Sequence, residues 1–129
     1  MNTSPTAIVL FAHGSRDPLW RLPIDAVATQ MQSLSPATTV RCAFLELTDP
    51  DLGSTVDALV QMGHTAIRIV PMFLGVGRHA REDLPQLVAE LQQRHPGLGL
   101  TLQMPIGEEP EMTLCMARIA LQNHSPVKT

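Results

Sequence analysis

The sequence is short of cysteine, of basic residues and of long apolar runs, and each shortage excludes a class of protein. Cys42 and Cys115 are the two cysteines in 129 residues, and they lack the close spacing of a redox or zinc motif. A disulfide framework is therefore not expected, and both are predicted to be buried thiols. Nine Lys and Arg against twelve Asp and Glu give a net charge of −3, which argues against nucleic-acid binding, because such binding rests on phosphate neutralisation.

No apolar run is long enough to cross a bilayer. The run at residues 7–12 falls far short of the roughly 20 residues that a membrane span needs, and no signal-peptide pattern is present. We therefore expect a cytoplasmic protein that does not enter the membrane. The length of 129 residues and the 44% hydrophobic content predict a single domain over residues 1–129, with its core at about 7–120 and a frayed tail at 125–129.

Four apolar runs rich in Val, Ile, Leu or Phe are predicted to be strands, and a helical pattern follows each. Pro71 cannot donate to a central ladder, so the third strand should be regular only before it. Alternating strands and helices require parallel crossovers that place helices on both faces of the sheet. We therefore predict an α/β fold, a three-layer α/β/α sandwich with a four-stranded, mainly parallel sheet. The predicted strands are residues 7–12, 40–45, 66–74 and 100–104.

The helices are predicted from apolar residues at three- and four-residue steps. The first lies between residues 19 and 34, with Pro23 in its opening turn; the second runs from about 52 to 62. The third stops at residues 95–97, and the fourth opens at Pro110. The apolar faces are Val27, Met31 and Leu34 in the first, Val56, Leu59 and Val60 in the second, Leu84, Leu87, Val88 and Leu91 in the third, and Met112, Met116 and Ile119 in the fourth.

Three polar residues, His13, Glu46 and His79, follow the first three predicted strands. Ligands bind outside the carboxyl ends of strands in open parallel sheets, so these side chains should converge at one edge. Two imidazoles and a carboxylate suit Co²⁺, Ni²⁺ or Fe²⁺, while the absence of nearby thiolates argues against structural zinc. Two plainer interpretations stay open: each histidine as a hydrogen-bonding loop residue, and Glu46 as a helix cap.

Glycines and arginines surround the two histidines. Glycine follows His13 and precedes His79, as expected where backbone approaches a ligand closely. A basic cluster on an acidic protein suits a small polyanion, although two of the arginines, 21 and 81, are equally compatible with solvated helix starts. No chemistry is assigned to the remaining histidines. The glycines are Gly14, Gly75 and Gly77, the arginines are Arg16, Arg21, Arg78 and Arg81, and the remaining histidines are His64, His95 and His124.

Five short motifs stand out: His-Gly-Ser-Arg at 13–16, Phe-Leu-Glu at 44–46, Pro-Met-Phe-Leu at 71–74, Gly-Arg-His at 77–79 and Asp-Leu-Pro at 83–85. Together they resemble the short form of the CbiX-type class II chelatases, the sirohydrochlorin cobaltochelatases and their ferro- and nickel-inserting relatives. The likeness covers about residues 7–120. It implies ATP-independent insertion of a divalent metal, with Co²⁺ favoured over Fe²⁺ or Ni²⁺, into sirohydrochlorin, a tetrapyrrole with eight carboxylates, in cobalamin or sirohaem biosynthesis. The metal is then a substrate, and no prosthetic group is expected.

The resemblance also implies roles for individual residues. His13 would be metal ligand and proton acceptor, His79 the second ligand, and Glu46 a further catalytic group that contacts metal or macrocycle. Because the larger chelatases of this superfamily carry two such lobes, the chain is expected to form a homodimer with two sites facing a shared cleft. The residues expected to contact the tetrapyrrole are Ser15, Arg16, Glu46, Leu74, Gly75, Val76, Gly77 and Arg78.

Two other functions share parts of this pattern. Histidine phosphatases also place a His-Gly motif after a strand, but here Ala12 rather than arginine precedes His13, and the expected phosphate clamp is missing. A metallochaperone or a tetrapyrrole carrier would use the same ligands without turnover, since binding and insertion need the same groups. The carrier is the alternative that stays open.

Overall fold

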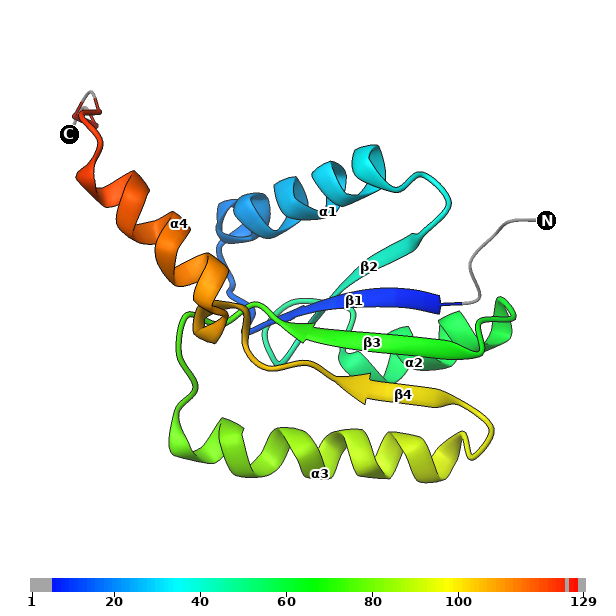
Figure 1. Cartoon of the computed structure of the whole chain (residues 1–129). Helices are drawn as coiled ribbons and strands as arrows, with labels where there is room; N and C mark the ends of the chain where they lie inside the picture. The colour runs from blue at the N-terminus through cyan, green and yellow to red at the C-terminus, as the bar shows by residue number, and fades with distance from the viewer. Residues whose placement is uncertain (1–5, 125, 128–129) are drawn as a thin grey trace.

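The computed structural model describes residues 6–124 and 126–127, and its centre is a four-stranded sheet in the order β2-β1-β3-β4 (Figure 1). All three neighbouring pairs are parallel. Helices lie on both faces of this sheet, so the predicted α/β/α sandwich is confirmed. The strands are β1 (Thr6–Ala12), β2 (Thr39–Phe44), β3 (Ala66–Pro71) and β4 (Gly99–Leu102).

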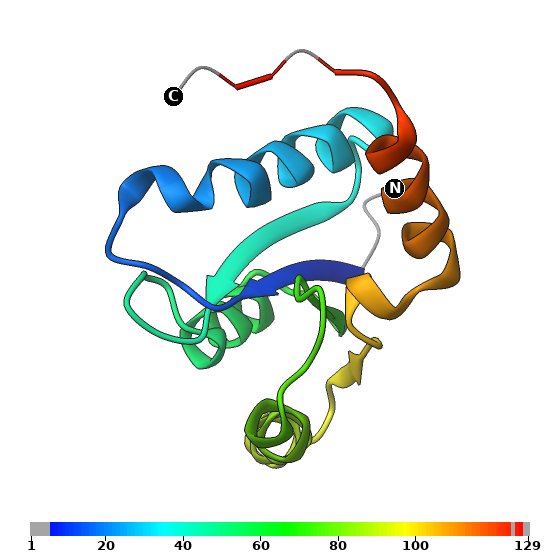
Figure 2. The same cartoon turned by 90° about the vertical axis from the view of Figure 1, so that its left-hand side faces the viewer.

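The helices divide between the two faces of the sheet, as Figure 2 shows. α1 (Leu22–Leu34) covers one face after a short 3₁₀ turn, η1 (Pro18–Arg21). α2 (Leu52–Gln61) and α3 (Arg78–Arg94) cover the other. A second 3₁₀ turn, η2 (Ile106–Glu108), leads into α4 (Pro110–Leu121).

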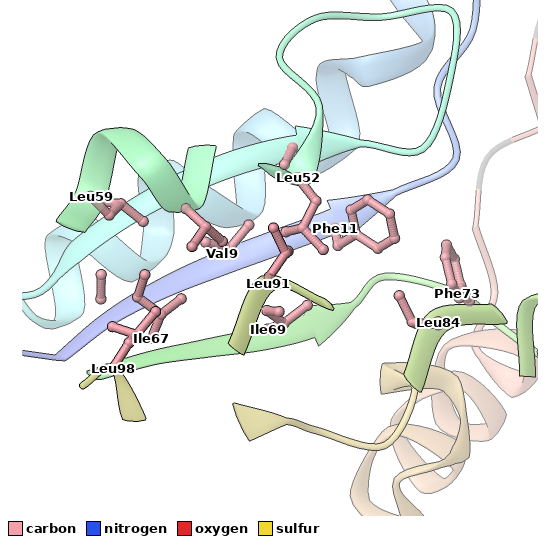
Figure 3. Close-up of a cluster of buried hydrophobic side chains, with 13 residues drawn as sticks. Val9, Phe11, Leu52, Leu59, Ile67, Ile69, Phe73, Leu84, Leu91 and Leu98 are labelled. Carbon is pink, nitrogen blue, oxygen red and sulfur yellow. The ribbon is translucent and has the colours of Figure 1, made fainter. Parts of the chain in front are cut away.

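The central strand β1 is buried on both faces, as expected for a strand in the middle of a parallel sheet. Its residues alternate between two apolar clusters, the larger one facing α2 and α3 and the smaller one facing α1. Figure 3 shows the larger cluster, which joins the sheet to both helices. Its largest members are Val9, Phe11, Leu52, Val56, Leu59, Ile67, Ile69, Phe73, Leu84, Leu91 and Leu98.

Local signals in the sequence set several element ends. β3 ends at Pro71, which lies opposite Phe11 in the ladder, so the strand stops being regular there as predicted. Pro23 lies in the first turn of α1, also as predicted. The Asp51 side chain caps α2 by accepting the Ser54 backbone N–H at 2.8 Å, and this bond lowers the pKa of that carboxyl group.

The prediction named the wrong residues for the apolar face of α1. Val27 is 37% exposed and Leu34 is 83% exposed. The stripe that packs on the sheet is Ile24, Ala28 and Met31, so only Met31 belongs to both sets. Both stripes have helical spacing, and the direction from which α1 meets the sheet decides between them.

The fourth helix does not bury the residues predicted for it. None of its residues is buried; Met112 and Met116 are half-buried, and Ile119 is 51% exposed. Figure 1 shows the reason: α4, in orange and red, leads away from the sheet instead of lying along it. Cys115 on this helix is consequently exposed, against the prediction, while Cys42 is half-buried and burial raises the pKa of its thiol.

No helix in the described part of the chain is long and apolar enough to cross a membrane. The cytoplasmic location and the single-domain boundaries stay predictions. The predicted frayed tail falls largely on residues 125 and 128–129, which lie outside the described residues.

Candidate active site

Backbone hydrogen bonds continue past the ends of β1 and β2 and carry two of the candidate residues out of the sheet side by side. The Leu45 N–H donates to the Ala12 carbonyl and the Glu46 N–H donates to the His13 carbonyl, both at 2.9 Å. Because Asp51 caps α2, Glu46 does not serve as that cap. His13 and Glu46 therefore leave the carboxyl edge of the sheet as neighbours.

Gly14 allows the loop after β1 to pack directly on the loop after β2. Its φ of +103° favours glycine, and a Cβ there would lie 1.7 Å from the Glu46 carbonyl oxygen. Next to this contact, the Thr48 hydroxyl donates to the Ser15 carbonyl at 2.8 Å and accepts the Ser15 N–H at 3.0 Å. The glycine was expected to make room for a ligand, and it makes room for the neighbouring loop.

The third candidate follows β3, which pairs with β1 on the side opposite to β2. His79 lies in the first turn of α3, directly after Arg78, and not in the loop. Gly75 and Gly77 precede the helix, and an added Cβ at either would meet nothing within 4 Å. A side chain at either position would therefore begin in open space among the described residues.

The three candidates meet in one cavity of about 370 Å³ at this edge of the sheet. Asp83 completes the polar lining, one helical turn after His79. Among the described residues, however, no three His, Cys, Asp or Glu side chains are grouped closely enough to hold a metal ion by themselves. The full lining is Phe11, His13, Leu45, Glu46, Phe73, His79, Ala80, Asp83, Leu84 and Leu87.

Asp83 and Phe73 also line the cavity, and the sequence did not point to a site role for either. Asp83 was part of a recognised motif, and its four-residue step from His79 on a helix is the pattern that would have pointed to it. Phe73 is 3% exposed, and its ring centroid lies 4.4 Å from that of His13, with the ring planes at 31°. Phe73 has no comparable spacing in the sequence, because it is a single apolar residue near the end of a strand.

The residues expected to contact a tetrapyrrole lie beside the cavity, and Glu46 alone of them lines it. Ser15 and Arg16 belong to the loop after β1, and residues 74–77 form the loop before α3. Leu74 is 71% exposed. The Arg78 guanidinium is 3.4 Å from the Glu82 carboxylate and largely exposed.

Arg21 has a structural role. It makes an ion pair with Asp25 at 2.9 Å, and its guanidinium lies 4.7 Å from the centroid of the Phe44 ring. This arrangement matches the interpretation of Arg21 as part of a helix start and not as part of a ligand site.

Comparisons with known proteins show which family the chain is similar to. A family model described as CbiX matches residues 7–122. The chain is 33% identical over 82 residues to a sirohydrochlorin cobaltochelatase of Methanopyrus kandleri, and 28% identical over 106 residues to a sirohydrochlorin ferrochelatase of Bacillus subtilis. These matches cover 64% and 82% of this chain, but only 57% and 41% of the relatives.

Two crystal structures have the same fold. One, from Marinobacter aquaeolei VT8 and designated CbiX, aligns with a TM-score of 0.79 and 31% identity over 90% of this chain and 94% of that one. The other is the sirohydrochlorin chelatase SirB from Bacillus subtilis subspecies spizizenii in complex with cobalt, with a TM-score of 0.74 and 28% identity. It aligns over 88% of this chain but 48% of its own.

Proposed function

Because the chain belongs to the CbiX family, we propose that it inserts a divalent metal ion into sirohydrochlorin at the cavity that contains His13 and His79. The observation that carries this proposal is the meeting of two imidazoles and the Glu46 carboxylate in one cavity at the carboxyl edge of the sheet. Relatives named for this reaction match most of the chain.

The reaction needs groups that bind a cation and accept protons. As M²⁺ enters the macrocycle, two pyrrole N–H protons leave, so the charge balances without an additional reactant. Neutral imidazole can hold a divalent ion or accept a proton near pH 7. We assign His13 as metal ligand and proton acceptor, His79 as second ligand, and Glu46 as the carboxylate that assists them.

The shape of the site suits transfer better than storage. A volume of about 370 Å³ is at the lower end of small-ligand pockets, so a tetrapyrrole would lie across the mouth with one face toward the imidazoles. The flanking loops, with Arg16 and Arg78, would then lie near its rim, where guanidinium groups can pair with carboxylates. Without a preassembled group of three ligands among the described residues, the ion would be held loosely until the macrocycle nitrogens take it.

The identity of the metal is a finer proposal, for which we favour Co²⁺ over Fe²⁺ and Ni²⁺. Relatives named for cobalt and for iron both match, and a His/His/carboxylate set does not choose among these ions. The metal is treated as a substrate in each case, and no prosthetic group is proposed.

The test is direct insertion by the purified wild-type protein. Sirohydrochlorin is mixed anaerobically with Co²⁺, Fe²⁺ or Ni²⁺, and its absorption spectrum is followed with and without protein. Multiple turnovers above the spontaneous rate are expected. A protein that binds metal or sirohydrochlorin but leaves every rate at background would be a carrier, and the chelatase proposal would be lost.

We further propose that the active unit is a homodimer, and α4 supports this. The helix carries only two charges, Glu111 and Arg118, yet Leu114 and Ile119 are each 51% exposed and Leu121 is 86% exposed. Within the described chain its main contacts are with η2. The stretch of the SirB chain that aligns with this chain is 48% of its length, so SirB has room for a second lobe. In this protein, a second copy of the chain would take the place of that lobe and cover α4.

Light scattering tests the dimer. Twice the 14.1 kDa chain mass is expected for the wild type, and the chain mass for a Leu114→Glu/Ile119→Glu variant. Met62→Glu is the matched control, because Met62 is 56% exposed at the end of α2 on the opposite face of the sheet. A monomeric wild type, or a dimer unaffected by the double change, would contradict this arrangement.

A further inference from the structure

The His13 ring is held in an unusual way for a metal-binding histidine. Such rings normally donate their second N–H to a carboxylate or a carbonyl, which fixes both tautomer and orientation. The His13 side chain makes no hydrogen bond or ion pair to any residue that the structure describes. The backbone bond from Glu46 fixes its carbonyl, but not its ring.

The contact that the ring does make is with Phe73. The two centroids are 4.4 Å apart at an interplanar angle of 31°, so the phenyl group covers one face of the imidazole. The rest of His13 is exposed. An aromatic contact of this kind restricts the plane of a ring without using its nitrogens.

Phe73 is itself well anchored and can serve as a fixed support. It is 3% exposed, and its ring packs against Phe11 at a centroid distance of 6.1 Å (Figure 3). Its carbonyl accepts the Gly107 N–H at 2.9 Å, which ties it to η2. A Cβ at Gly107 would lie 2.0 Å from the Leu74 carbonyl oxygen, so η2 fits tightly against this segment.

We propose that Phe73 is a positioning residue that orients His13 by ring contact and leaves both imidazole nitrogens free. The nitrogen that faces the cavity can hold the metal first and, once the ion has passed to the macrocycle, accept a pyrrole proton, while the N–H of the outer nitrogen gives its proton to solvent. An outer N–H that was hydrogen-bonded within the protein could not release its proton directly to solvent. The catalytic part of this inference rests on the proposed chelatase function; the ring contact does not.

The experiment removes the ring and keeps a large apolar side chain. Phe73→Leu is compared with Phe44→Leu, because Phe44 is also buried and in contact with another aromatic ring, Trp20 at 6.0 Å, but does not line the cavity. We expect kcat for insertion to fall about tenfold to a hundredfold in Phe73→Leu, as for a misplaced catalytic group, with KM for sirohydrochlorin changed less than threefold. Phe44→Leu should keep its kcat, and Phe73→Tyr should restore most of the loss.

An NMR measurement isolates the positioning role from general destabilisation. The ring protons of His13 should show a ring-current shift in the wild type and in Phe44→Leu, and lose it in Phe73→Leu. Phe73→Met provides the same test if the leucine variant does not fold. Unchanged His13 shifts, or a kcat within twofold of the Phe44→Leu control, would overturn the proposal. An inactive wild type would instead remove the chelatase function, and the NMR result would still decide the ring contact.

Discussion

The two ends of the sheet contain histidines in opposite situations. Near the amino end of β4, the His95 Nε2 lies 2.7 Å from an Asp57 carboxylate oxygen, and Arg94 reaches the same carboxylate at 3.0 and 3.1 Å. These bonds connect the end of α3 to α2, and the His95 side chain is only 19% exposed. At the carboxyl end, the exposed His13 has no side-chain hydrogen bond to the described residues.

This difference separates a structural histidine from one available to a ligand. The His95 ring nitrogen is bonded to the Asp57 carboxylate, so it helps to hold α2 and α3 together and is not available to a ligand. A solvated, unbonded nitrogen beside an apolar wall costs the fold little and remains open to a metal or a proton. Changes at one end of the sheet should therefore alter stability, while changes at the other should alter chemistry.

The largest effect should come from Gly14→Ala, the change that would break the carboxyl end. The new Cβ would overlap the Glu46 carbonyl oxygen, and the alanine backbone would have to adopt a φ of +103°. The ends of β1 and β2 would therefore separate. We expect the free energy of unfolding to fall by at least about 2 kcal/mol, measured by denaturant titration, with loss of insertion.

Gly75→Ala is the matched control for this change. An added Cβ there meets nothing within 4 Å, and the free energy of unfolding should stay within about 0.5 kcal/mol of wild type. If the two alanine variants were equally stable, the close packing of the two loops would be refuted.

A smaller effect is expected from Asp57→Asn at the other end. The hydrogen bond from His95, with Arg94 adding to it, lowers the pKa of Asp57 below its unfolded value of about 3.9. The unfolded chain then takes up the proton first as pH falls, so the stabilisation is present above that value and is lost in more acid solution. The asparagine variant should lose up to about 1 kcal/mol at pH 7, since the carboxylate is partly exposed.

The same variant should also depend less on pH between about pH 5 and pH 2, as followed by denaturant titration, and should insert metal at the wild-type rate. Asp83→Asn is the control for the stability curve, because that carboxylate makes no ion pair with the described residues. Identical acid profiles for wild type and Asp57→Asn would contradict a contribution from this ion pair.

The sequence predicted the parts of the fold that depend on local chemistry. Apolar runs located all four strands, and Pro71 and Pro23 located a strand end and a helix start. The convergence of His13, Glu46 and His79 followed from parallel topology alone. What depends on the direction of packing was missed: the face of α1, the exposed α4, and the contact between Phe73 and His13.

The most direct test of the account compares insertion rates of His13→Ala and His79→Ala with those of His124→Ala and His95→Ala. His124 is exposed and lies outside the cavity, and His95 is bonded to Asp57. We expect the first two variants to fall to the uncatalysed rate with unchanged stability. His124→Ala should match the wild type, and His95→Ala should be less stable but active. A wild-type rate in either His13→Ala or His79→Ala would contradict the shared site.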